Sequence, residues 1–180
     1  MKNRYLTSNN LNRALSKQAA KTIKAVPKEC WRNATRSLLT RPELAHAHYV
    51  EGWIVLPALP VPLEHGWLEL DGQIIDPTPG TWKSRHAYFA ALRLSKDDLL
   101  QALREDTALP IVWRYGWGGM KHPAYAQAYQ DAWWVDVPVP AKQRAQISKG
   151  PKPVIVLPSS LSERTKTCGF LPTQVVGKAG

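Results

Sequence analysis

The chain has 180 residues, which is enough for one domain with a hydrophobic core and too short for two domains of ordinary size. Its composition is 44% hydrophobic with eight tryptophans, which argues against a wholly disordered protein. The formal net charge is +10, and the positive charge is concentrated at the two ends of the chain. No acidic residue precedes Glu29, and only Glu163 follows Asp136. These basic ends favour acidic partners such as nucleic acid, anionic lipid or acidic proteins.

Two helices are predicted at the start of the chain. Apolar residues recur every four positions from residue 9 to about residue 24, which is typical of an amphipathic helix, and Pro27 lies beyond its end. A second helix is expected from about residue 29 to residue 40, because Trp31, Ala34 and Leu38 can share one face and Pro42 terminates the run. Cys30 then lies in the first turn of this helix.

Strands are predicted in the middle of the chain. Residues 49–56 are rich in β-branched and aromatic side chains, and the prolines at 57, 60 and 62 indicate a rigid connection after that strand. Two short strand patterns, 65–70 and 73–76, flank the dipeptide Asp71-Gly72, which is the strongest hairpin signal that a single sequence offers. A further strand is expected over residues 88–94.

The remaining elements complete the fold class. Ser95 is expected to cap a helix that ends near residue 105, and residues 111–114 are strand-like. The glycines at 116, 118 and 119 indicate a turn or mobile loop. A last helix is expected over about residues 123–134. Beyond residue 137, prolines and lysines indicate an extended tail with one strand at 154–157. This order predicts an α+β protein with an antiparallel sheet, divided into a basic N-terminal helix (1–26), a central domain (27–136) and a Pro-rich basic extension (137–180).

The register of the predicted hairpin follows from its turn. If Asp71 and Gly72 are the two turn residues, Trp67 faces Asp76, and side chains alternate along each strand. The pairs before that one are Leu70–Gln73, Glu69–Ile74 and Leu68–Ile75. His65 and Asp76 therefore become diagonal neighbours on one face of the sheet, with Cα atoms about 7–8 Å apart, a gap that a His–carboxylate hydrogen bond can close.

Cys30, His65 and Asp76 are the residue types that acyl transfer by a thiol requires. Such chemistry needs a thiolate, a nearby imidazole and a group that holds the imidazole in the useful tautomer. The first turn of a helix favours a thiolate through the helix dipole and offers free backbone N–H groups to an oxyanion. The sequence therefore indicates Cys30 as a candidate nucleophile that His65 and Asp76 could serve.

These residues also carry a resemblance to a known family. The strings Cys30-Trp31, His65-Gly66-Trp67-Leu68-Glu69 and Ile75-Asp76-Pro77-Thr78-Pro79 resemble, in order and chemistry, the Cys-Trp, His-x-Trp and Asp-x-Thr motifs of the transglutaminase-like, papain-like superfamily. The resemblance covers roughly residues 28–80. It implies a helix bearing the cysteine packed on an antiparallel sheet bearing the histidine and the aspartate. It also implies that Cys30 is the nucleophile, His65 the general base and acid, and Asp76 the orienting carboxylate.

The function expected from the resemblance is an acyl-transfer enzyme that acts on a peptide or protein amide through a thioester on Cys30. Hydrolysis is favoured over transfer because water is the default second nucleophile, and an arylamine-acetyltransferase-like activity is an alternative for the same three residues. The alternative from another class is an inactive protein of this fold that binds nucleic acid or an acidic protein through its basic termini.

Other patterns bear on location, metals and aromatic residues. The N-terminus lacks the apolar core of a secretory signal and no stretch approaches the ~20 apolar residues that span a bilayer, so a cytoplasmic protein is expected. His46 and His48 could ligate a metal together with His65 or His86, but no regular ligand set closes, and we expect no metal or cofactor. The tryptophans are expected in the core, with one or two of them lining a cleft.

Overall fold

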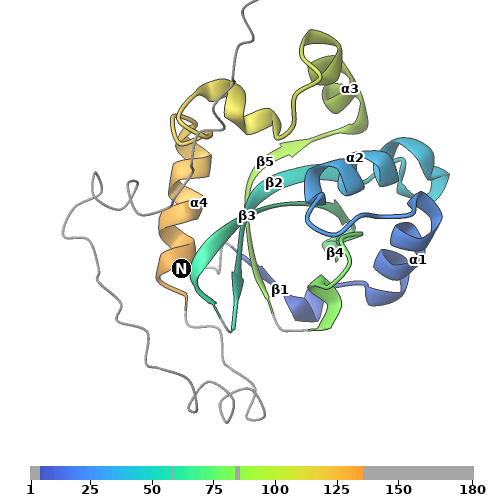
Figure 1. Cartoon of the computed structure of the whole chain (residues 1–180), viewed down its shortest axis with the longest axis horizontal. Coiled ribbons are helices and arrows are strands. Elements are labelled where there is room, and N and C mark those ends of the chain that lie inside the picture. The colour runs from blue at the N-terminus through green and yellow to red at the C-terminus, as the bar shows by residue number, and fades with distance from the viewer. Residues whose placement is uncertain (1–4, 58, 84–85, 136–180) are drawn as a thin grey trace, which may run out of the picture. The chain divides into compact units, whose positions relative to one another are not determined.

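The strands form one five-stranded antiparallel sheet in the order β1-β5-β2-β3-β4 (Figure 1). The structure is a computed structural model that describes residues 5–57, 59–83 and 86–135. The strands are β1 (Leu6–Thr7), β2 (His48–Leu56), β3 (Leu59–Leu70), β4 (Gln73–Ile75) and β5 (Ala87–Leu94). The sheet and its helices confirm the predicted α+β class.

Four α-helices accompany the sheet in the described part of the chain: α1 (Arg13–Ile23), α2 (Cys30–Thr40), α3 (Lys96–Glu105) and α4 (Pro123–Trp133). Short 3-10 turns occur at η1 (Ser8–Asn10), η2 (Pro42–Leu44), η3 (Thr81–Lys83) and η4 (Ile111–Tyr115). Asn12 caps α1 by accepting a hydrogen bond from the Leu15 N–H at 3.0 Å, and Ser95 caps α3 in a reciprocal pair with Asp98. The helices expected after residues 29, 95 and 123 are confirmed within a residue or two.

Successive residues of β2 pack into different hydrophobic clusters, because neighbouring side chains of a strand point to opposite faces of the sheet. Trp53 contributes to a cluster with α4, whereas Ile54 joins a cluster around Trp67 and Leu11. A third cluster joins α1, α2 and α3 to the sheet through these residues: Ala19, Ala34, Leu38, Tyr49, Leu68, Ile75 and Leu99. Helices α1 and α2 pack against one another and lie next to β4 and β3 (Figure 1).

The hairpin register is confirmed for the pairs nearest the turn. The three pairs Leu70–Gln73, Glu69–Ile74 and Leu68–Ile75 are those derived from the Asp71-Gly72 turn. The predicted pair of Trp67 with Asp76 does not form, because β4 ends at Ile75. The backbone N–H of Asp76 instead donates to Ser16 Oγ at 3.0 Å, and its carbonyl accepts from Trp82 Nε1 at 2.6 Å.

Two predicted segments are corrected in the first half of the chain. The helix expected from residue 9 begins at Arg13, because residues 8–10 form a 3-10 turn and Leu11 bridges to Ile74 of β4. The connection expected after Leu56 is instead the first part of β3, which begins at Leu59. Prolines are compatible with that strand because β4 pairs with residues 68–70, and no other described strand lies on that edge of the earlier part of β3.

The strand expected over residues 111–114 is wrong, because these residues form the 3-10 helix η4. The backbone N–H groups of Ile111 and Val112 donate to the carboxylate of Glu51 at 2.6 and 2.8 Å, so they are not available to a strand ladder. The glycines at 116, 118 and 119 lie in turns with positive φ, as the predicted turn requires. The predicted extension over 137–180, including the strand at 154–157, lies outside the described residues.

Two glycines allow backbones to approach closely. A Cβ at Gly66 would lie 2.6 Å from Cδ1 and 3.1 Å from Cα of Trp31, so α2 sits directly on β3 at this position. A Cβ at Gly52 would lie 2.1 Å from the carbonyl oxygen of Phe89, where the pairing of β2 with β5 shifts register. Gly66 therefore fixes how near the start of α2 lies to the residues of β3.

The described helices were also compared with the length and apolarity that a bilayer demands. None of those in residues 5–57, 59–83 and 86–135 is long and apolar enough to cross a membrane.

We expect Gly66→Ala to lower the free energy of unfolding by about 1–3 kcal/mol, because the added methyl group overlaps Trp31 and moves the start of α2. Urea unfolding measures the loss, and the indole N–H resonance of Trp31 reports the displacement. Gly72→Ala is the matched control: its Cβ would meet no atom within 4 Å, and only its positive φ adds a cost of roughly 1 kcal/mol. A Gly66→Ala protein with wild-type stability and an unshifted Trp31 resonance would contradict the close approach.

Candidate active site

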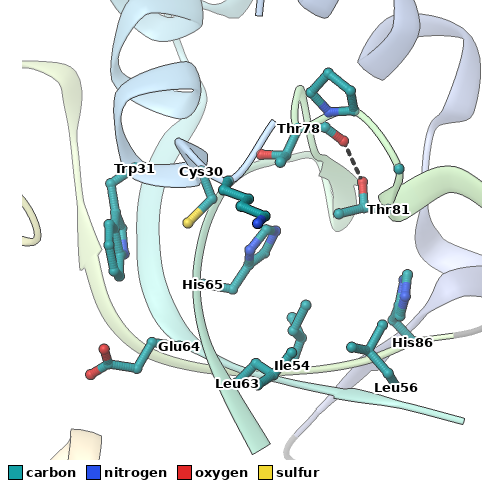
Figure 2. A pocket seen from close by; sticks show the side chains of 13 residues that line it. Cys30, Trp31, Ile54, Leu56, Leu63, Glu64, His65, Thr78, Thr81 and His86 are labelled. Carbon is teal, nitrogen blue, oxygen red and sulfur yellow. Dashed lines mark hydrogen bonds between the residues drawn. The ribbon is translucent and has the colours of Figure 1, made fainter. Parts of the chain in front are cut away.

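The structure brings Cys30, His65 and Asp76 together from three elements. Cys30 is the first residue of α2, His65 lies in β3, and Asp76 follows β4. All three are buried, with exposed fractions of 6%, 5% and 0%. Figure 2 draws the Cys30 side chain and the His65 ring in the same cleft, and Cys30 is among the groups that raise the pKa of His65.

His65 and Asp76 form a buried pair. The Nε2 atom of His65 lies 2.8 Å from Oδ2 of Asp76, which leaves Nδ1 as the ring nitrogen available to Cys30. The carboxylate is held by other groups as well: Oδ2 accepts from the hydroxyl of Tyr88 at 3.1 Å, and Oδ1 accepts from the backbone N–H of Thr78 at 2.9 Å. The imidazole is therefore fixed in orientation by a carboxylate that is itself fixed.

Electrostatic interactions within the pair favour its charged form. Burial alone lowers the pKa of His65, but the charge of Asp76 and the hydrogen bonds to Asp76 and Cys30 outweigh burial and raise that pKa to about 10. Burial acts to raise the pKa of Asp76, whereas the charge and hydrogen bond of His65 and the N–H of Thr78 lower it, and the lowering prevails. At neutral pH the pair is an imidazolium facing a carboxylate, with the Cys30 sulfur beside the imidazolium.

The loop before Cys30 is tied to α2 by one side chain. Asn33 is fully buried, and its amide donates to the carbonyl of Val26 at 2.7 Å while its oxygen accepts from the N–H of Val26 at 3.1 Å. Glu29 occupies the N-cap position without a side-chain hydrogen bond to the backbone N–H groups of the helix. The N–H groups of the first turn of α2 therefore have no cap from that side chain.

Cys30 and His65 line a cleft of about 450 Å³, whereas Asp76 is fully buried and does not line it. One side carries Trp31 and Glu64, and apolar side chains from β2 and β3 line the part below Cys30 in Figure 2. The other lining residues, which bound the cleft around His65, are Lys28, Thr78, Pro79, Gly80, Thr81 and His86.

Several residues of the site were not predicted from the sequence. Tyr88 and Ser16 support Asp76 from β5 and α1, Asn33 holds the loop before Cys30, and Glu64 lines the cleft. Only Glu64 had a signal, since it precedes the predicted histidine in the same strand. The other three act through contacts between elements distant in the sequence, which a single sequence does not reveal.

The remaining sequence candidates are placed elsewhere or only partly near the site. Within the described ranges, no three His, Cys, Asp or Glu side chains are placed to hold a metal ion. His86 does line the cleft, and burial lowers its pKa. The core placement expected for the tryptophans is correct for Trp53 and Trp67 but wrong for three others, whose exposed fractions are 38% to 80%: Trp113, Trp117 and Trp134.

Comparison of the chain with models of known protein families, with curated proteins and with solved structures finds no match. The resemblance to the transglutaminase-like, papain-like superfamily therefore rests on the motif residues alone. The chemistry of the site has to be argued from its own geometry.

We expect Asp76→Asn to lower the free energy of unfolding by about 3–5 kcal/mol near pH 6, because it leaves His65 buried without its counter-charge. The raised pKa of His65 adds stability that is complete below its ordinary value of 6.5 and is lost as the pH rises through about 10. The lowered pKa of Asp76 adds stability that is present above 3.8 and is lost as the pH falls. Wild-type stability should therefore decline from pH 6.5 toward pH 10.

Urea unfolding at several pH values measures both effects. Asp97→Asn, at an exposed position in the first turn of α3, is the matched control and should follow the wild-type pH profile. A decline above pH 6.5 that is as steep in Asp76→Asn as in the wild type would show that the His65–Asp76 pair does not produce it.

Proposed function

We propose that this protein is a thiol-dependent acyl-transfer enzyme that cleaves an amide through a thioester on Cys30. The observation that carries the proposal is the buried His65–Asp76 ion pair in the same cleft as Cys30, the first residue of a helix. Burying a carboxylate and an imidazolium carries a desolvation penalty that their attraction and hydrogen bonds must offset. An adjacent thiol is the group that such a pair would serve in catalysis.

The proposed reaction proceeds in two steps. The thiolate of Cys30 adds to the amide carbon, the C–N bond breaks, and the imidazolium of His65 gives its proton to the departing amine. Water then adds to the thioester, His65 takes one of its protons, and the C–S bond breaks to release a carboxylic acid and restore the thiolate of Cys30 beside the imidazolium of His65. The N–H groups at the start of α2 stabilise the oxyanion of each tetrahedral intermediate.

The proposal includes a transglutaminase-like core. Three features support it: the order Cys30, His65, Asp76 along the chain, the packing of the cysteine-bearing helix on β3 at Gly66, and the antiparallel hairpin that leads from the histidine to the aspartate. A peptide or protein amide is the proposed substrate class, because the cleft is open and lined by both apolar and hydrogen-bonding groups. Hydrolysis is favoured over transfer because water is the default acceptor.

A binding function is the second candidate. The basic side chains of the first helix and the loop after it are exposed, which an acidic partner could use: Arg13, Lys17, Lys21, Lys24 and Lys28. This candidate predicts binding to nucleic acid that weakens steeply with salt and persists in Cys30→Ala. Binding that is lost with Cys30→Ala, or that ignores salt, would contradict it.

We expect iodoacetamide to alkylate Cys30 at least about tenfold faster in the wild type than in His65→Ala, because the imidazolium stabilises the attacking thiolate. The measurement is the rate of mass increase in a Cys168→Ser background, which leaves Cys30 as the single thiol.

His48→Ala is the matched control, since His48 is an exposed histidine at the start of β2 and should leave the rate unchanged. Equal alkylation rates in the wild type and His65→Ala would overturn the proposed chemistry.

A further inference from the structure

One side of the cleft holds a carboxylate that has no cationic partner in the described part of the chain. Glu64 precedes His65 in β3 and lines the cleft together with Trp31 (Figure 2). Its Oε1 atom accepts hydrogen bonds from the hydroxyl of Tyr125 at 2.8 Å and from Trp113 Nε1 at 3.3 Å. Both donors are neutral, and the ion pairs within these ranges involve other acids. The carboxyl group of Glu64 is therefore held in place by neutral donors and forms no ion pair within the described residues.

A second buried carboxylate lies near Glu64. Glu51 is fully buried and accepts from the hydroxyl of Tyr49 at 2.7 Å and from two backbone N–H groups of η4. Burial raises the pKa of Glu51, and the nearby charge of Glu64 raises it further. Burial also raises the pKa of Glu64. A cation that enters the cleft beside Glu64 would offset the unfavourable energy of both carboxylates.

Aromatic rings flank the same position. The ring of Trp31 lines the cleft, and Trp113 packs edge-on against it with ring centroids 5.8 Å apart. Trp113 is also the indole that donates to Glu64, so the two rings and the carboxylate lie beside one another. An indole face and a carboxylate are complementary to an ammonium or guanidinium group.

We propose that Glu64 and Trp31 form a subsite for a cationic side chain of the substrate, lysine or arginine, next to the sulfur of Cys30. The apolar residues of the cleft, Ile54 and Leu63, would contact the aliphatic stem of that side chain. The subsite rests on the proposed function, because it would hold the cationic side chain of a substrate whose amide Cys30 attacks. It narrows the proposed substrate class to amides next to a lysine or an arginine.

The net charge of the chain makes this subsite a local feature. A protein with a formal charge of +10 repels cations in general. Selectivity for a cationic ligand over its neutral analogue must then come from groups at the site, which a single charge-neutralising substitution can test. Glu64→Gln is suitable because its side-chain oxygen can still accept from Tyr125 and Trp113.

The experiment titrates the Cys30→Ala protein with N-acetyl-arginine N-methylamide and follows the indole N–H resonance of Trp31 by NMR. The neutral isostere, N-acetyl-citrulline N-methylamide, is titrated in parallel. We expect the arginine compound to bind at least about fivefold more tightly, the difference expected from one ion pair and one cation–π contact at a partly exposed site. Glu64→Gln should remove this difference.

Glu29→Gln is the matched control, because Glu29 lies directly before Cys30 but outside the cleft wall and is paired with Arg32 at 3.3 Å. It should keep the preference for arginine. Equal binding of the two compounds, no saturable shift with the arginine compound, or an equal loss of preference in Glu29→Gln and Glu64→Gln would each overturn the subsite. These titrations do not use the thiol, so the two proposals can be tested separately. If the titrations fail while alkylation of Cys30 still depends on His65, only the subsite is wrong. If the titrations succeed while alkylation does not depend on His65, only the proposed acyl-transfer chemistry is wrong.

Discussion

The buried pair of His65 and Asp76 is the interaction on which the rest of the described structure converges. Two charges can remain inside a protein only if their attraction and their hydrogen bonds offset the loss of water. Here the carboxylate of Asp76 is held by Tyr88 of β5 and by the N–H of Thr78. Its backbone is held by Ser16 of α1 and Trp82 of η3. One residue thus ties the end of the hairpin to a helix, a strand and a turn.

A second constraint brings the thiol to this pair. The start of α2 lies against β3 because residue 66 has no side chain, and the loop before the helix is closed by the two hydrogen bonds of Asn33 to Val26. Cys30 is therefore placed by backbone contacts on both sides of it. The subsite proposed at Glu64 depends on the same contact, since Trp31 is both the residue that packs on Gly66 and the ring beside the carboxylate.

The sequence was sufficient where short-range geometry decides the structure. The Asp71-Gly72 turn determines the register of the hairpin, and this alone placed His65 near Asp76. It was insufficient where a distant side chain replaces a regular backbone partner. Ser16 takes the N–H of Asp76 out of the ladder, and Glu51 takes the N–H groups of residues 111 and 112, which turned a predicted strand into a 3-10 helix.

The protonation state of His65 can be followed directly by the ¹⁵N resonances of its ring as a function of pH. We expect an imidazolium at pH 7.5 that titrates with a pKa of about 10 in the wild type, and a neutral ring at pH 7.5 in Asp76→Asn. A smaller decrease of the pKa is expected in Cys30→Ser, because the sulfur contributes to the raised value. A neutral His65 ring in the wild type at pH 7.5 would contradict the central claim.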